Sequence, residues 1–327
     1  MLRIYLDQAE WVDMSKYRTG HREGGRFQDA YDLSTRLVEQ GDISFVISTA
    51  HYYETQRRPN PTSRRDLGRT IADLSKFHSI APSHVIVPAE IRAYLTGQPV
   101  TSQIEVFGVG FGHAFHTDMK LPEPDPTLSH QMSPTEFARL GELVRYEAEL
   151  FVLAAPPEAD AAARQMFETV NKIHDSAQRF ADGQTTLGQQ IDELKVRHKL
   201  ADVVAGNEIS NIMGPLIIEC AQLGFDIEDL LRSRQAILHL MENLPSRWVE
   251  SELRRVRLRN PQQPWVKNDL NDILALSVAV PYCDVVVTEK QWAKHLNDLG
   301  IAKRYNTVVL YDLADVPEAI VTATRTE

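Results

Sequence analysis

Short apolar runs, most of them rich in β-branched residues, recur at both ends of the chain. Each run is apolar on both faces, which is typical of a parallel strand that helices cover from both sides. The runs that we interpret as strands are Arg3–Leu6, Ile43–Ile47, His84–Val87, Asp284–Val287 and Thr307–Leu310. Strand patterning therefore occurs in two blocks, one near each end of the sequence.

Helical stripes separate the strands of the first block. The apolar spacing predicts a helix from about Phe27 to Gln40, and a second stripe runs through Leu67, Ile71 and Leu74. Alternation of strand, helix and strand is typical of right-handed crossovers in a parallel sheet. We therefore predict an α/β fold with a parallel-sheet core flanked by helices.

The strand pattern stops after about residue 112. The proline-rich segment Lys120–Pro126 is predicted to be a linker, and nearly everything from Pro134 to Arg259 has a helical pattern. Strands resume only at Asp284. The economical interpretation is one discontinuous core, residues 1–112 and 262–327, interrupted by a mainly α-helical insertion over residues 113–261.

Composition narrows the class of protein only a little. The 327 residues suffice for about two domains, and the two cysteines, Cys220 and Cys283, form no metal-binding pattern. The net charge of -10 argues against a non-specific nucleic-acid coat, but local charge still allows a nuclease. Because an acid follows the first strand at once and no long apolar run occurs, we expect a cytoplasmic protein with no membrane contact.

Acidic residues recur just after predicted strands or at the start of the helices beside them. The acids placed in this way are Asp7, Glu54, Asp269, Asp272 and Glu289. Functional groups gather at the carboxyl ends of strands in an open parallel sheet, so we expect several of these acids to share one edge. Crowded carboxylates repel one another unless a cation neutralises them. Oxygen ligands without a cluster of Cys or His favour Mg²⁺ or Mn²⁺ over zinc.

The order and spacing of these motifs resemble the PIN-domain nucleases. That family has an Asp after strand one, a Ser-x(5)-Glu element after strand two, an Asp that opens a later helix, and a Thr-x-Asp or similar element after strand four. The matching elements here are Asp7, Ser48 with Glu54, Asp272, and Thr288 with Glu289. The resemblance covers about residues 1–110 and 262–327 and implies a PIN-like catalytic core with a metal site.

The last motif departs from the family pattern, because the acid follows Thr288 directly and is a glutamate. Asp284 is therefore an alternative to Glu289 as the fourth acid. The resemblance implies that Asp7, Glu54 and Asp272 hold Mg²⁺ or Mn²⁺, with Asp284 or Glu289 completing the set. Ser48, Thr288 and Asp269 are expected to support these acids, Asp269 chiefly as a helix cap.

Two groups of arginines are candidates for phosphate contacts. The stronger lies in the helical run before residue 262, and the other surrounds the segment that follows Glu54. Their members are Arg254, Arg255, Arg257 and Arg259 in the first group, and Arg57, Arg58, Arg64 and Arg65 in the second. An ordinary solvated helix face explains the first group equally well.

Taken together, the motifs favour a metal-dependent endoribonuclease, possible roles being a toxin or a defence effector. A structure-specific DNA nuclease and a catalytically degenerate PIN-like RNA-binding module are the alternatives. A haloacid-dehalogenase-like phosphatase is disfavoured because Ala9 stands where that family needs a second acid. Expected partners are nucleic acid, RNA before DNA, and either a second copy of the chain or an antitoxin-type protein.

Overall fold

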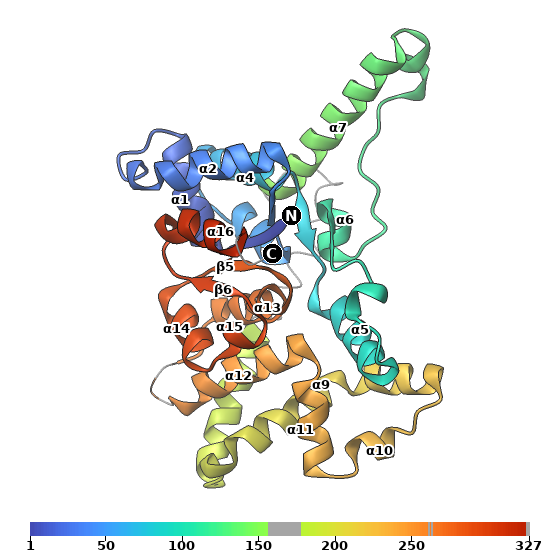
Figure 1. Cartoon of the computed structure of the whole chain (residues 1–327), viewed down its shortest axis with the longest axis vertical. Coiled ribbons are helices and arrows are strands. Elements are labelled where there is room, and N and C mark those ends of the chain that lie inside the picture. The colour runs from blue at the N-terminus through green and yellow to red at the C-terminus, as the bar shows by residue number, and fades with distance from the viewer. Residues whose placement is uncertain (156–177, 261, 263, 325–327) are drawn as a thin grey trace.

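The central sheet contains four parallel strands in the order β2-β1-β5-β6 (Figure 1). The computed structural model describes residues 1–155, 178–260, 262 and 264–324. The four strands are β1 Leu2–Leu6, β2 Ile43–Val46, β5 Val285–Val287 and β6 Val308–Leu310. β1 pairs with β2 on one side and with β5 on the other, so the two blocks of strands predicted from the sequence meet at β1.

The predicted strand at His84–Val87 is wrong, because these residues lie in α5 (Ser83–Thr96). A short apolar run is equally compatible with a buried helix, and Ile86 and Val87 are indeed buried there. The strand that does occur is β3 (His78–Ile80), which is antiparallel to β4 (Phe107–Val109) and bridges to the end of β2 through Ile47. Two of its three residues, His78 and Ser79, are polar, which explains its weak pattern in the sequence.

Alternate residues of the strands enter two separate cores. Ile4 and Leu6 point to a core shared with one set of helices, whereas Tyr5 points to a core shared with another set. The first set is α1 Gln8–Arg18, α2 Gln28–Gln40, α4 Pro61–Ser75 and α16 Val316–Thr324. The second set is α5 with α12 Pro245–Arg259, α13 Lys267–Tyr282, α14 Lys290–Asp298 and α15 Ile301–Arg304. Helices thus cover both faces of the sheet, as the pattern predicts.

The middle of the chain is helical in the part that the structure describes. Its helices are α6 Gly110–Phe115, α7 Pro134–Ala154, residues 178–193, α9 Leu200–Leu223, α10 Ile227–Leu231, α11 Arg234–Glu242 and α12. Residues 156–177 of the predicted helical stretch lie outside the described residues. Figure 1 shows α7 extending away from one end of the molecule, while α9, α10 and α11 lie at the other end. No described helix combines the length and the apolar character needed to cross a membrane.

Two of these helices share the cores of the sheet. Leu150 and Leu153 of α7 join the first core, and Val249 and Leu253 of α12 join the second. The segment predicted as an insertion therefore packs on both layers of the α/β unit. The proposed boundaries at residues 112 and 262 remain a prediction from the sequence.

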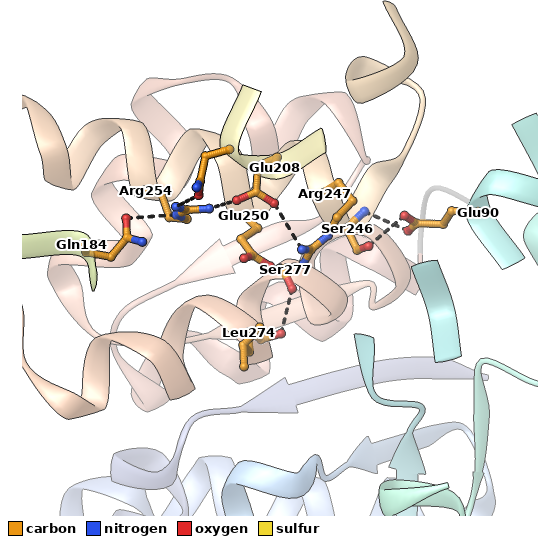
Figure 2. Close-up of polar contacts among 10 residues, drawn as sticks. Glu90, Gln184, Glu208, Ser246, Arg247, Glu250, Arg254, Leu274 and Ser277 are labelled. Carbon is orange, nitrogen blue, oxygen red and sulfur yellow. Dashed lines mark hydrogen bonds and ion pairs between the residues drawn. The ribbon is translucent and has the colours of Figure 1, made fainter. Parts of the chain in front are cut away.

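A buried polar network fastens α12 to α9 (Figure 2). Glu208 of α9 forms ion pairs with Arg247, at 3.2 Å, and with Arg254. Gln184 contacts Arg254 as well: Oε1 of Gln184 accepts a hydrogen bond from Nε of Arg254 at 3.2 Å. Removal of one partner from a buried ion pair leaves a charge without compensation in a medium of low dielectric constant. Arg247 and Arg254 therefore stabilise the packing of α12 against α9.

Glu90 extends the same network to α5. Its carboxylate accepts hydrogen bonds from the backbone amide and the hydroxyl of Ser246, both at 2.8 Å, and from the Tyr282 hydroxyl at 2.7 Å. Figure 2 shows Glu90 facing Ser246 at the start of α12. Burial raises the pKa of Glu90 to about 7. The side chain thus joins α5, α12 and α13 and titrates near neutral pH.

Glu90→Gln is expected to remove a pH dependence of stability. Because burial raises the pKa of Glu90 from 4.5 to about 7, the folded protein binds this proton more tightly than the unfolded chain. The resulting stabilisation is complete below about pH 4.5 and is lost as the pH rises through about 7. At pH 8 we expect the glutamine variant to be more stable than the wild type by roughly 3 kcal/mol, and at pH 4.5 the two should agree. Urea unfolding at both pH values measures this, and parallel pH profiles would contradict it.

Candidate functional site

The strand order reverses at β1, so the carboxyl ends of β1 and β5 form the topological switch point of the sheet. The chain leaves β1 toward β2 on one side and later returns to β5 on the other side. Ligands bind at such a switch point in open α/β sheets. Asp7 follows β1 and Thr288 follows β5, and the Thr288 hydroxyl donates a hydrogen bond to Oδ2 of Asp7 at 3.2 Å. The two sequence motifs from opposite ends of the chain therefore meet here.

Backbone hydrogen bonds also hold Asp7 in place. It is the N-cap of α1, and its Oδ1 accepts a hydrogen bond from the backbone amide of Gln8 at 2.7 Å. Its own amide donates to the carbonyl of Val287 at 2.9 Å. Burial raises the pKa of Asp7 in spite of these hydrogen bonds. The carboxylate is thus fixed at the switch point in an environment that disfavours its charge.

Glu54 and Asp272 approach the same switch point from two helices, α3 (Thr49–Gln56) and α13. Burial, and after it the charge of Asp7, raises the pKa of Glu54 to about 7 and that of Asp272 to about 8. A hydrogen bond from Asn271 partly offsets this effect at Glu54. The indole Nε1 of Trp292 donates to Oδ2 of Asp272 at 3.0 Å. Both predicted acids therefore lie close enough to Asp7 to sense its charge.

Glu10 belongs to the same group, although the sequence analysis did not single it out. It lies three residues after Asp7, on the same face of α1, and is only 7% exposed. Its Oε2 is buried and has no hydrogen-bond partner among the described residues. Burial, followed by the charge of Asp7, raises its pKa to about 8. The spacing of three residues between Asp7 and Glu10 indicates a shared site only if a helix starts directly after the strand. The apolar stripe of α1 is too weak to predict that helix from the sequence.

Glu289, rather than Asp284, is the fourth acid at this edge. Glu289 is exposed at the start of α14, and its charge raises the pKa of Asp7, Glu10, Glu54 and Asp272. Asp284 lies at the opposite end of β5, where its Oδ2 accepts a hydrogen bond from the backbone amide of Arg3 at 2.6 Å. The length of the strand separates it from the other acids, so the prediction of Asp284 as a metal ligand is corrected.

The residues expected to support the acids divide into two kinds. Thr288 contacts Asp7 directly, whereas Ser48 is the N-cap of α3 and is buried, with its Oγ 3.2 Å from Nδ1 of His51. Asp269 accepts a hydrogen bond from the backbone amide of Val266 at 2.7 Å and pairs with Arg257, which confirms its role as a cap of α13. Because that carboxylate is already bonded to a cation, Asp269 acts on the helix and not on the cluster.

The arginines of α12 are not available as a basic surface. Arg254 and Arg257 are buried, and they pair with Glu208 and Asp269, respectively. Arg255 is half-buried and pairs with Glu252, so only Arg259 is exposed. The predicted phosphate contacts of Arg254 and Arg257 are therefore wrong. Periodicity identified the apolar stripe of this helix, but it gave no indication that acids from α9 and α13 cover the other faces.

A groove with basic residues does lie beside Glu54, formed by the end of α3 and the start of α13. Its lining includes Arg57, Arg58 and Lys267, with Asn271 at the side of Glu54. Arg57 and Lys267 are exposed, and Arg58 is half-buried. Of the other arginines named in this region, Arg64 is buried and donates to the carbonyls of Ala154 and Arg58. Two of the basic residues next to the acids, Arg57 and Arg58, thus come from the second predicted group, and Lys267 belongs to neither group.

The donor set fits a hard divalent cation. None of the five acids forms an ion pair with Lys, Arg or His in the part of the chain that the structure describes. Within the same residues, no three His, Cys, Asp or Glu side chains converge closely enough to form a ready metal cage. The unpartnered oxygen of Glu10 and the mutual repulsion of the acids nevertheless leave carboxylate oxygens for which a cation is the natural counterpart.

Comparison with protein-family models, with curated proteins and with solved structures yields no match. The resemblance to the PIN-domain nucleases therefore rests on the sequence motifs. The geometry described above adds a mixed α/β fold with a parallel sheet and a cluster of acids at its switch point.

Asp272→Asn is expected to stabilise the metal-free protein and to weaken its response to Mn²⁺. At pH 9, above the pKa of about 8, the substitution removes one negative charge from a crowded group, which should raise the free energy of unfolding by at least about 1 kcal/mol. Bound metal stabilises the folded state, so Mn²⁺ should raise the melting temperature of the wild type more than that of the variant. Differential scanning calorimetry with Mn²⁺ and with EDTA measures both effects.

Asp284→Asn is the matched control, because it changes the same residue type at the other end of β5. It is expected to keep the full response to Mn²⁺. Equal responses in all three proteins would show that the metal binds elsewhere.

Proposed function

We propose that the protein is a metal-dependent endoribonuclease whose active site is the cluster of Asp7, Glu54, Asp272 and Glu289, with Glu10 beside it. The observation that carries this proposal is the gathering of five acids, without cationic partners among the described residues, at the switch point of the sheet. Such an arrangement destabilises the fold by charge repulsion. Its persistence is explained most simply by a function that needs the negative charge.

A divalent ion such as Mg²⁺ or Mn²⁺ would supply the positive charge that lets an anionic phosphate approach and that activates water for attack. The chain provides the donors for it: Asp7, Glu54 and Asp272 are the candidate ligands, and Glu289 stands at the exposed rim. Thr288 and the amide of Gln8 each donate a hydrogen bond to one carboxylate oxygen of Asp7, and Trp292 donates to one oxygen of Asp272, so the protein orients both carboxylates. These contacts fix the acids before any ligand arrives.

The basic groove beside Glu54 supports a nucleic-acid substrate. Arg57, Arg58 and Lys267 line it together with Glu54, so a polyanion whose backbone follows this groove passes one acid of the cluster. Basic side chains outside the cluster and acids inside it complement a phosphodiester and a metal ion, respectively. This division of charge also explains how a chain with a net charge of -10 binds nucleic acid locally.

RNA is the proposed substrate on the strength of the resemblance to PIN-domain nucleases, with a toxin or a defence effector as the expected setting. A structure-specific DNA nuclease is the runner-up. A catalytically degenerate module that binds RNA is the third possibility. The first two differ in the polymer that is cut, and the third differs from both because it binds without cutting.

Cleavage is expected to require Mn²⁺ or Mg²⁺ and Asp7. The wild type should cut single-stranded RNA in Mn²⁺ and not in EDTA, and Asp7→Asn should lose cleavage because the central carboxylate of the cluster is gone. Asp284→Asn should cut like the wild type. Denaturing gels of labelled RNA, single-stranded DNA and branched DNA supply the measurement. Activity in EDTA would reject the proposal, a preference for branched DNA would favour the runner-up, and RNA binding without cleavage would favour the degenerate module.

Lys267→Ala combined with Arg58→Ala is expected to weaken RNA binding equally for all sequences. Each lost phosphate contact should reduce the slope of log K against log[salt] for single strands by roughly 0.7. The control is Arg259→Ala, which removes an exposed arginine of α12 that lies outside the groove. Fluorescence anisotropy over a salt series determines the slopes. If only the control changes the slope, the phosphate path lies on α12 after all.

A further inference from the structure

A second cavity shares one lining residue, Asn271, with the basic groove. It has a volume of about 350 Å³, close to the lower end of the range of roughly 300–1,000 Å³ that is usual for small-molecule sites. The start of α3, the start of α5, the end of α6 and the middle of α13 form its walls. The site described above does not use this cavity.

One residue, Asn271, links the cavity to the acidic cluster. Asn271 lines the cavity, lines the basic groove and donates a hydrogen bond to Glu54. α3 carries Glu54 and α13 carries Asp272, and each also supplies wall residues, such as Ala50 and Leu274. A ligand in the cavity would therefore lie next to any group held by the two acids.

The lining combines apolar walls with a few polar groups. Leu270, Leu274, Val278 and Phe115 supply apolar surface, whereas Ser48, Ser83, His84 and Asn271 supply hydrogen-bonding groups. Burial and the neighbouring His116 lower the pKa of His84, which favours the neutral imidazole with one donor and one acceptor. Flat apolar faces with a hydrogen-bonding edge are the chemistry of a nucleobase. Proteins that bind single strands combine such a surface with a basic path for the backbone.

We propose that this cavity receives the base of the nucleotide next to the phosphodiester bond that is cut. The inference rests on the proposed function and deepens it: the backbone follows the groove of Arg58 and Lys267, one base turns into the cavity, and the phosphate between them faces the acids. A base can enter only when it is unpaired, so the site selects single-stranded or unstacked nucleotides, and the polar lining sets the base preference.

Filling the cavity tests the proposal. Leu274→Trp and Ala50→Leu add volume from half-buried positions on two of its walls, and Leu143→Trp makes the same kind of change at an exposed site on α7. The substrates are a single-stranded RNA and a series in which one nucleotide at a time is abasic. In the wild type and in Leu143→Trp, one abasic position should lower kcat/KM at least tenfold. In the filled variants, intact RNA should be cut as poorly as that abasic substrate, with no further loss when the base is removed.

The outcomes separate this inference from the proposed function. If the wild type cuts RNA in Mn²⁺ but no abasic position matters, or if the abasic penalty persists in both folded cavity variants, the cavity does not bind a base and the nuclease proposal stands. If nothing is cut, binding decides the question: fluorescence of 2-aminopurine placed along the RNA should change on binding to the wild type and not to Ala50→Leu. An equal change in both proteins, or none in either, overturns the inference.

Discussion

Electrostatic repulsion among acids at the carboxyl ends of β1 and β5 is the constraint on which the remaining features of the site depend. Asp7, Glu10, Glu54 and Asp272 all have a raised pKa, with burial as the main cause and the neighbouring acids as a further cause. Each acid comes from a different helix or strand end except Asp7 and Glu10, which share the start of α1. A fold that brings these charges together without a cationic partner among the described residues is less stable for it, which is typical of a functional site.

Two other buried acids, Glu208 and Asp269, lie in the opposite kind of environment. Both side chains are buried, but each forms an ion pair with an arginine of α12. The pair of Glu208 joins α9 to α12, and Asp269 also caps α13. The contrast separates these two structural acids from the acids of the cluster. It also explains why the most arginine-rich helix in the sequence is part of the interior, while the basic residues beside the acids lie at the ends of α3 and α13.

Local pattern predicted four strands of the sheet, α2, α4 and the acids Asp7, Glu54 and Asp272, because each depends on residues close in the sequence. It failed where the outcome depends on distant partners. His84–Val87 became a helix because α9 and α13 offer it apolar contacts, and the direction of Asp284 follows from the register of β5 against β1. Glu10 was missed because α1 buries polar and apolar residues together and therefore has almost no amphipathic stripe. Four separate segments form the cavity beside Asn271, so no local sequence pattern predicts it.

The central claim is that the acids at the switch point share a divalent metal ion. Anomalous diffraction from crystals soaked in Mn²⁺ tests it most directly, because the signal locates the ion without reference to activity. The account predicts a peak within ligand distance, about 2.0–2.3 Å, of oxygens from Asp7 and at least one of Glu54 and Asp272. A peak at Asp284 or on the helical layer, with none at the switch point, would contradict it.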